Sequence, residues 1–477
     1  MRLGVLKKIG IVAAVIGLTI AVLYQFFGLR VVFNGAAGPR LAFTTSGDAQ
    51  ARVVEEHRAA QREAQQRAAP ATTADSPVGP AAAPAVEGAD AQPYWTDFRG
   101  PARDGHYREM PVRTTWPSGG LTPLWKQPIG GGYSSFVAAR GRAFTIEQRG
   151  PEEVAAAYDL RTGLELWTSR WRGVFREALG GDGPRATPTW SDGLLYVLGA
   201  LGELRCLEEA TGRLVWRTNI LDDNRAGNLQ WGMAASPLVV DENVVVLPGG
   251  PNGRSVVAYN RRSGARAWSV LGEPQAYSSP MLVTLAGRRQ LLVVSGSRLI
   301  GLAPEHGEVL WSYPWVTTAE INVSQPLLVG PDRVFISSGY DVGAAVLEIS
   351  SEGRAFGVRE IWRNIRMKNK FTSSVLHDGF IYGLDESILA CVDAATGELK
   401  WKGGRYGYGQ VLLASGRLIV LTEEGELVLV AASPDGHQEL ARSPAIEGKT
   451  WNHPAMAGGR LLVRNLAEMA AFDLRGP

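Results

Sequence analysis

The stretch CVDAATGELKW, residues 391–401, has the pattern of a β-strand, a tight turn and a returning strand that ends on tryptophan. Gly397 supplies the positive φ that a hairpin turn requires, and Asp393 and Thr396 can hydrogen-bond the turn backbone. The same phrase recurs as AYDLRTGLELW at 157–167 and as RCLEEATGRLVW at 205–216. A chain that repeats one hairpin is built from copies of one supersecondary unit.

The number of units can be read from the recurring spacing of glycine and tryptophan. A turn glycine is followed four residues later by tryptophan at Gly163/Trp167, Gly212/Trp216, Gly264/Trp268, Gly307/Trp311 and Gly397/Trp401. A weaker copy is Gly436/Leu440, and a disrupted copy lies around Gly353 with Trp362 after an insertion. Apolar runs and turns before each phrase bring the total to eight units of four short strands. Four strands in roughly forty to fifty residues predict an all-β, eight-bladed β-propeller.

The recurring tryptophan is a large flat side chain at one fixed place per blade, which is typical of blade-to-blade packing. The last unit stops before its fourth strand, whereas LTPLWKQPI at 121–129 is an orphan strand with Trp125 in the fourth-strand position. We therefore expect the N-terminal strand to complete the last blade and close the ring. The predicted structural docking set is Trp125, Trp167, Trp216, Trp268, Trp311 and Trp401.

The segment before the propeller predicts a membrane anchor. Ile9–Leu29 contains no charged side chain and has about the length of a transmembrane helix, and Arg2, Lys7 and Lys8 before it place the N-terminus in the cytoplasm. A cleaved signal peptide is the alternative, but bulky residues stand where its cleavage site would lie. The predicted domains are 1–30, a cytoplasmic stub and transmembrane signal anchor; 31–92, an Ala/Pro-rich flexible tether in which 51–69 forms a short solvated helix; and 93–477, the propeller.

Charge and cysteine content restrict the partners. The predicted propeller is close to neutral, so it gives no electrostatic argument for binding nucleic acid. Cys206 and Cys391 occupy the same place in two copies of the repeat, where they would lie too far apart for a disulfide. We expect both to be small buried apolar residues.

The repeated phrase resembles the tryptophan-docking repeat of eight-bladed pyrroloquinoline quinone (PQQ) propellers. This family comprises the quinoprotein alcohol dehydrogenases and the non-catalytic BamB-type scaffold of outer-membrane β-barrel assembly. The lead-in YWTDFRGPARDGHY at 94–107 and GGGYSS at 130–135 resemble the start of bacterial PQQ-binding-like propellers, so the resemblance covers about 93–477. It is specific for fold and poor for function, because propellers serve as enzymes and as scaffolds.

A dehydrogenase of this family implies a vicinal Cys-Cys disulfide, a calcium ion held by Glu and Asn, and an Asp base. The sequence has no Cys-Cys pair and no Asp/Asn/Glu loop with calcium-binding spacing. Its six histidines show no metal-ligand spacing. His453, in TWNHP, stands at the opening of a blade and can face the channel, although we favour a structural role for it.

The innermost strand of each blade should begin around one mouth of the central channel. Cations beside flat rings there can hold an acidic planar ligand such as PQQ. The alternative, which the sequence favours, is that these polar residues solvate a water-filled hole. The candidate cofactor-binding residues are Tyr133, Arg185, Tyr277, Asn322, Lys370 and Trp451.

Taken together, these features predict a non-catalytic binding or scaffold protein on the inner membrane of a bacterium, with its propeller in the periplasm. Its partners would be the membrane, through the N-terminal helix, and proteins or peptides, through the propeller loops. No catalytic or metal-ligating residue is predicted. A PQQ-dependent dehydrogenase of alcohols or sugars, loaded with PQQ and calcium, is the alternative.

Overall fold

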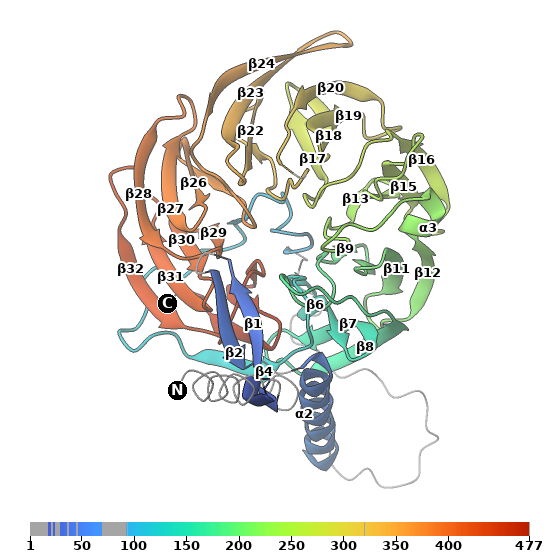
Figure 1. The fold of residues 1–477 in the computed structure, drawn as a ribbon, viewed down its shortest axis with the longest axis vertical. Coiled ribbons are helices and arrows are strands. Elements are labelled where there is room, and N and C mark those ends of the chain that lie inside the picture. Colours follow the sequence, from blue (N-terminus) through green and yellow to red (C-terminus); the bar gives the residue numbers. More distant parts are fainter. Residues whose placement is uncertain are drawn as a thin grey trace, which may run out of the picture.

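The computed structural model describes residues 18–20, 22–23, 29–35, 38–43, 46–68, 92, 94–318 and 320–476. Its described residues form a ring of eight antiparallel blades around a central axis, which confirms the predicted propeller (Figure 1). Short strands of β-branched and aliphatic residues alternate with glycine turns. Such strands gain stability only by stacking their faces, and the ring lets every blade bury both of its faces.

The first four blades follow one another along the chain. Blade 1 contains β5 (Val137–Ala139), β6 (Arg142–Arg149), β7 (Glu152–Asp159) and β8 (Glu165–Arg172). Blade 2 contains β9 (Thr189–Ser191), β10 (Leu194–Leu198), β11 (Glu203–Glu208) and β12 (Leu214–Asn219), followed by the short helix α3 (Ile220–Asn224). Blade 3 contains β13 (Leu238–Val240), β14 (Asn243–Val246), β15 (Val256–Asn260) and β16 (Arg266–Val270). Blade 4 contains β17 (Met281–Leu285), β18 (Arg288–Val294), β19 (Arg298–Leu302) and β20 (Val309–Pro314).

Two of the remaining blades recruit strands from the start of the propeller. Blade 5 contains β21 (Leu327–Leu328), β22 (Arg333–Ser338), β23 (Gly343–Glu352) and β24 (Ala355–Asn364). Blade 6 contains β25 (Val375–His377), β26 (Phe380–Asp385), β27 (Ile388–Asp393) and β28 (Leu399–Arg405). Blade 7 contains β29 (Gln410–Ala414), β30 (Arg417–Leu421), β31 (Glu426–Ala431), β32 (Glu439–Pro444) and, parallel to β29, β3 (His106–Tyr107). Blade 8 contains β33 (Ala455–Ala457), β34 (Arg460–Arg464), β35 (Glu468–Asp473) and β4 (Pro123–Pro128).

The predicted closure of the ring is confirmed, because β4 pairs with β35 and brings Trp125 opposite Ala471. Arg464 fastens the same seam from inside. Its guanidinium is fully buried and donates to Gly130 O at 2.9 Å and to Thr145 Oγ1 at 2.8 Å, both on the blade 1 side. The first and last blades are thus joined by a shared sheet and by buried polar contacts.

Most of the docking tryptophans reach the next blade. Trp167 donates its indole N–H to Glu209 O at 2.9 Å, and its ring lies where a side chain at Gly212 would stand. The rings of Trp125, Trp216, Trp268 and Trp362 lie in the same way on turn glycines of the following blades. Trp311 differs, because its indole N–H donates to Gln290 of its own blade. The long β23–β24 hairpin of blade 5 has no turn glycine in the usual place, which accounts for the difference.

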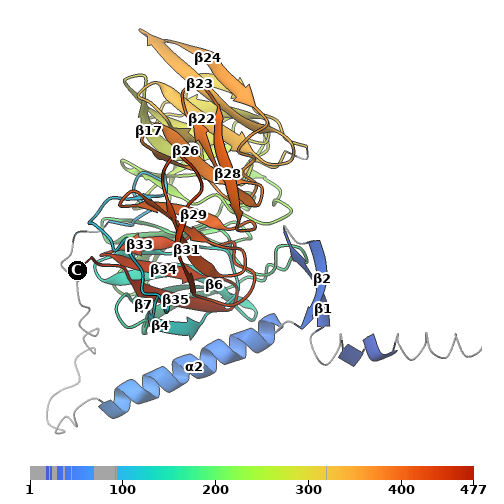
Figure 2. The same cartoon turned by 90° about the vertical axis from the view of Figure 1, so that its left-hand side faces the viewer.

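The region before the propeller contains more structure than a tether. β1 (Leu29–Asn34) and β2 (Gly38–Phe43) form a hairpin on one face of the ring, and α2 (Gly47–Ala68) runs along its edge (Figure 2). The predicted helix is present as α2, but one of its faces is not solvated as expected, because Val54 and Arg58 are fully buried. Arg58 donates to Pro128 O at 2.9 Å and stacks on the ring of Tyr158. α2 therefore holds the seam between blades 8 and 1 from outside.

Among the residues that the structure describes, no helix combines the length and apolar character needed to cross a bilayer. Most of the predicted anchor, Ile9–Leu29, lies outside the described residues, as does most of the Pro/Ala-rich stretch at 69–93. Cys206 and Cys391 are free and buried, as predicted.

Candidate functional site

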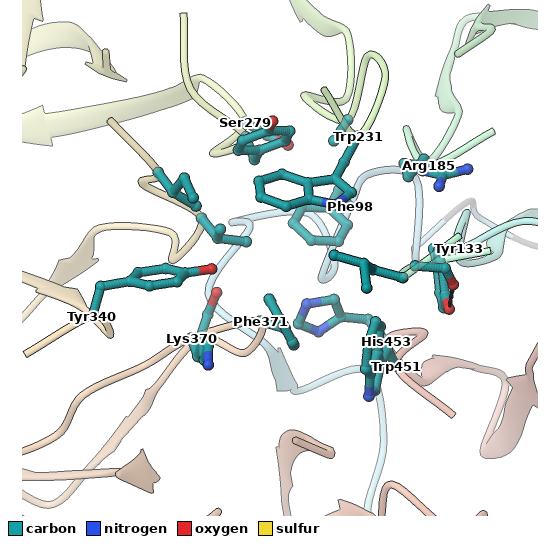
Figure 3. Close-up of a pocket in the computed structure, with 17 residues that line it drawn as sticks. Phe98, Tyr133, Arg185, Trp231, Ser279, Tyr340, Lys370, Phe371, Trp451 and His453 are labelled. Atoms are coloured by element: carbon teal, nitrogen blue, oxygen red, sulfur yellow. Dashed lines mark hydrogen bonds between the residues drawn. The ribbon is translucent and has the colours of Figure 1, made fainter. Parts of the chain in front are cut away.

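An aromatic cup opens at one end of the propeller axis, on the face where the fourth strand of each blade connects to the first strand of the next. We call this face the mouth face, and the opposite face, made by the turns between first and second and between third and fourth strands, the turn face. The cup has a volume of about 360 Å³. It is lined by Phe98, Tyr133, Leu179, Gly180, Arg185, Trp231, Ala234, Tyr277, Ser279, Ile321, Val323, Tyr340, Lys370, Phe371, Ser373, Trp451 and His453 (Figure 3).

The rings of the cup contact one another in two groups. Tyr133 stacks on Trp451 with 5.5 Å between ring centroids, and Phe371 lies 4.8 Å from the same indole. Trp231 and Tyr277 form the other group, 5.6 Å apart. Because aromatic residues bury large areas with few rotatable bonds, this wall offers an apolar surface that is already in shape for binding.

Three cations stand at the wall of this cup. Arg185 lies over the rings of Phe175 and Tyr133, and Lys370 lies 4.9 Å from the ring centre of Tyr408. Lys449 lies 4.3 Å from the indole of Trp451 and donates to Gly180 O at 3.0 Å. Burial lowers the pKa of Lys449 to about 8 and that of Arg185 to about 10. The cup therefore combines apolar walls with positive charge.

A plug formed by residues 94–107 closes the axis behind the cup. Arg103 is buried and donates to Pro280 O at 2.8 Å, to Pro237 O and to Thr189 Oγ1, which come from blades 4, 3 and 2. Arg99 donates to Ser374 O of blade 6 at 2.9 Å. Only a segment on the axis can reach blades on both sides of the ring, so the plug makes the channel a blind cup rather than a pore.

The floor of the cup is Phe98 of the plug against His453 of blade 8. Their rings meet edge-on with centroids 4.8 Å apart (Figure 3). Burial, with the nearby Arg99 guanidinium, holds the pKa of His453 well below its usual value, so the imidazole is neutral at physiological pH. A neutral imidazole can donate or accept one hydrogen bond and carries no charge for a ligand.

Five of the six predicted mouth residues line the cup: Tyr133, Arg185, Tyr277, Lys370 and Trp451. Asn322 does not. Its amide is buried, donates to Ser295 O at 2.9 Å and accepts from Ser338 Oγ at 2.8 Å, so it ties its loop to blades 4 and 5 while its neighbours Ile321 and Val323 face the cup.

Sequence reasoning missed Phe98, Trp231 and Tyr340. The prediction used only the starts of the innermost strands, whereas Tyr340 lies in a turn between second and third strands that reaches the same face. Trp231 stands in the long connector between blades 2 and 3, and Phe98 in the plug, neither of which has a counterpart in the repeat. Of the three, only Tyr340 could have been predicted from the repeat, because the turns between second and third strands recur in each blade and reach the mouth face.

The lining suits the planar acidic ring system of a quinone cofactor but does not supply the calcium ligands or the base that a dehydrogenase needs. Its cations and flat rings suit an acidic planar molecule, but none of its members carries a carboxylate or a side-chain amide to hold calcium or act as a base. The nearby Glu177 accepts from Leu179 N, and Glu423 accepts from the indole of Trp451. Nowhere in the described part of the chain do three or more His, Cys, Asp or Glu residues gather as a metal site.

Comparison with known proteins identifies the family to which the chain belongs. The family model described as outer membrane protein assembly factor BamB matches residues 151–403, just over half of the chain. The chain belongs to the BamB family. BamB of Yersinia pestis is 22% identical over 291 residues, which cover 58% of this chain and 70% of the relative. BamB of Burkholderia pseudomallei strain K96243 is 25% identical over 313 residues, covering 56% of this chain and 78% of the relative.

Solved structures show the same fold at low identity. BamB from Moraxella catarrhalis superposes with a TM-score of 0.53 at 14% identity, covering 75% of this chain and 98% of that BamB. Quinohemoprotein alcohol dehydrogenase ADHIIG from Pseudomonas putida HK5 also gives 0.53, at 13% identity, covering 82% of this chain and 81% of the enzyme. Fold similarity does not separate BamB from the dehydrogenase, whereas the family match does.

Proposed function

We propose that this protein is a non-catalytic, extracytoplasmic scaffold of the BamB type that holds partner proteins on its mouth face. Support comes from the family match and from where apolar side chains are exposed. Of the large exposed apolar residues in the described loops of the ring, all but Met110 lie on mouth-face connectors and turns: Val174, Leu179, Leu201, Val316 and Ile365. Exposed apolar side chains that share one face of a protein are typical of an interaction surface.

The proposal includes an N-terminal anchor. It rests on the uncharged run Ile9–Leu29 and on the three basic residues before it. The hairpin β1–β2 follows that run and lies on the mouth face, with Gly35 packed against Tyr408 beside the cup. The anchor would thus leave the propeller on the same side as the partner.

Site-specific photo-crosslinking in the full chain, expressed in its own membranes, tests the scaffold role. A crosslinking amino acid is placed at Ile365, which is 57% exposed on the mouth face after β24, and as a matched control at the exposed Asp378, in the turn-face loop between β25 and β26 of the next blade. We expect a discrete protein adduct at Ile365 and none at Asp378. Equal labelling at both sites, or no adduct at Ile365, Val316 or Leu179, would refute the proposal.

A second candidate is a PQQ-dependent dehydrogenase, and the cation–ring wall of the cup is the observation that favours it. When bound, PQQ would supply the redox chemistry, while Arg185 and Lys449 would hold its carboxylates and Trp451 would stack on it. The lack of an acid in the lining argues against turnover. Purified full chain that binds PQQ and reduces a dye with alcohols in the presence of calcium would establish this function in place of the scaffold.

A further inference from the structure

Arg185 and Lys370 line the cup, Lys449 stands beside it over Trp451, and none of the three forms an ion pair with a carboxylate of the described residues. Most arginines of the propeller form ion pairs, yet no Asp or Glu oxygen among the described residues lies within 4.0 Å of a charged nitrogen of Arg185, Lys370 or Lys449. Arg185 donates instead to Gly181 O at 2.6 Å, and Lys370 contacts the Tyr408 hydroxyl at 3.4 Å. Ring faces and carbonyls attract a cation without neutralising it, so the positive charge remains open to an anion.

Glu177 and Glu423 attract these cations from beyond ion-pair distance. Glu177 accepts from the backbone N–H groups of Leu179 and Gly180, and thereby shapes the loop at the rim. Glu423 accepts from Trp451 Nε1 at 2.8 Å and from Tyr408 N at 3.2 Å. Both carboxylates position the wall through these hydrogen bonds, so neither occupies the ion-pair position on a cation that an entering anion would take.

The shape of the site points to a polypeptide. The cup is mostly apolar, and the Tyr340 hydroxyl, which has no hydrogen-bond partner among the described residues, projects into it (Figure 3). Leu179 of the cup lining is 39% exposed, and on the mouth face outside the lining Val316 and Ile365 are each 57% exposed. This apolar surround extends beyond the cup itself, whereas a small molecule bound inside would leave it in water.

We propose that the cup binds a carboxylate-bearing end or turn of a partner polypeptide, with an aromatic or large aliphatic side chain inserted between Trp231 and Trp451. The carboxylate, from a chain terminus or from an Asp or Glu next to the inserted residue, is held by Lys449 and Arg185, and Lys370 adds positive charge from the other side of the cup. This inference rests on the proposed scaffold function and names the chemistry that the scaffold recognises.

The test is fluorescence anisotropy of labelled peptides with the purified full chain. Four pentapeptides that end in phenylalanine are compared in two pairs. The first pair has a neutral sequence and differs only in ending as a free carboxylate or as an amide. The second pair ends as an amide and differs only in having Asp or Asn before the phenylalanine. We expect saturable binding of the free acid, of the Asp peptide or of both, at least about tenfold tighter than their neutral counterparts. The two charged peptides distinguish a terminus from a side chain.

Lys449→Gln and Arg185→Gln should each weaken binding of the charged peptide by about tenfold, which is the loss expected for one charge-assisted contact. Lys400→Gln is the matched control, because Lys400 pairs with Glu398 at the start of β28, away from the cup. Circular dichroism and the thermal midpoint of each variant verify folding. A variant that misfolds is replaced by Lys370→Gln.

Equal affinity for charged and neutral peptides would overturn the proposal, as would displacement of the charged peptide by anionic phospholipid vesicles but not by neutral ones, which would assign the cup to a lipid surface. Absence of peptide binding alongside an adduct at Ile365 would refute the cup as the recognition site and leave the scaffold role intact. Peptide binding without any adduct would refute the scaffold role and leave the cup as a peptide-binding site.

Discussion

The mouth face and the turn face are made by the same repeated hairpin and differ in almost every other respect. On the turn face, short loops repeat one chemistry: Asp159 Oδ1 accepts from Thr162 N at 2.7 Å, and Asp393 Oδ1 accepts from Thr396 N at 3.0 Å. On the mouth face, connectors differ in length and carry the rings, cations and exposed apolar residues. The repeat thus specifies the turn face, and departures from the repeat specify the binding face.

The plug that separates the two faces should give the largest effect. Arg103→Ala would leave Asp97 without its 2.9 Å partner and several carbonyls of blades 3 and 4 without donors, at a cost of about 3 kcal/mol or more in the free energy of unfolding. Urea denaturation of the full chain measures it. Arg108→Ala, an exposed change in the same segment, should cost at most about 0.5 kcal/mol. Similar midpoints for the two variants would show that the plug does not support the ring.

Glycine substitutions test whether the faces tolerate change unequally. Gly212 on the turn face has a φ of +70°, and a Cβ there would overlap the ring of Trp167. Gly212→Ala should therefore cost about 2 kcal/mol, from backbone strain and overpacking. Gly227 in a mouth-face connector has open space around it, so Gly227→Ala should change stability by less than about 0.5 kcal/mol. Thermal unfolding of both variants compares them, and an equal loss would contradict the difference between faces.

The charge of Lys449 makes binding at the mouth face depend on pH. A lysine with a pKa of about 8 is charged below that pH and neutral above it, so affinity for a charged peptide should fall about tenfold between pH 7 and pH 9. Glu423, Glu177 and Arg185 face the same ammonium group, and Arg185, with a pKa of about 10, stays charged across this range. Anisotropy titrations at several pH values measure the fall, and binding at pH 9 should take up protons.

In Lys449→Gln the dependence between pH 7 and pH 9 should disappear. A dependence that persists unchanged in this variant would assign the titration to another group.

The smallest effect is expected from an exposed ion pair of the turn face. Arg289 contacts both oxygens of Asp241 at 2.8 and 2.9 Å, and both side chains are about half exposed. Because water screens such pairs, Arg289→Ala should cost about 0.5 kcal/mol and leave peptide binding unchanged. A cost above about 1.5 kcal/mol, or any loss of binding, would show that the turn face contributes more than architecture.

The sequence predicted what the repeat encodes. Eight blades, closure through Trp125 and free buried cysteines all follow from phrases whose spacing recurs. Placement failed where no copy existed to compare. The Trp311 indole bonds within its own blade because the next blade carries a long hairpin. Asn322 lies in a connector of irregular length, and its side chain points away from the cup while its neighbours Ile321 and Val323 line it.

The helix at α2 was predicted, but its packing and the burial of the plug were beyond sequence reasoning for a related reason. Arg99 and Arg103 lie in a segment rich in charge and glycine, which predicts an exposed loop, yet both are buried by carbonyls contributed from distant blades. Arg58 lies on a polar helix whose binding surface is made by the ring seam. Local patterns cannot report partners that only the closed ring brings together.

A ring of eight similar blades would offer a partner eight equivalent ways to sit on it, and the β1–β2 hairpin removes that degeneracy. Its turn rests against Tyr408 of blade 7, on the side of the ring where blades 7 and 8 stand (Figure 1). The exposed apolar residues of the mouth face belong to blade 2 and to the connectors that enter blades 2, 5 and 6. On the proposed scaffold function, a protein that contacts both the hairpin and these residues would have a single rotational register, and we expect one partner per propeller.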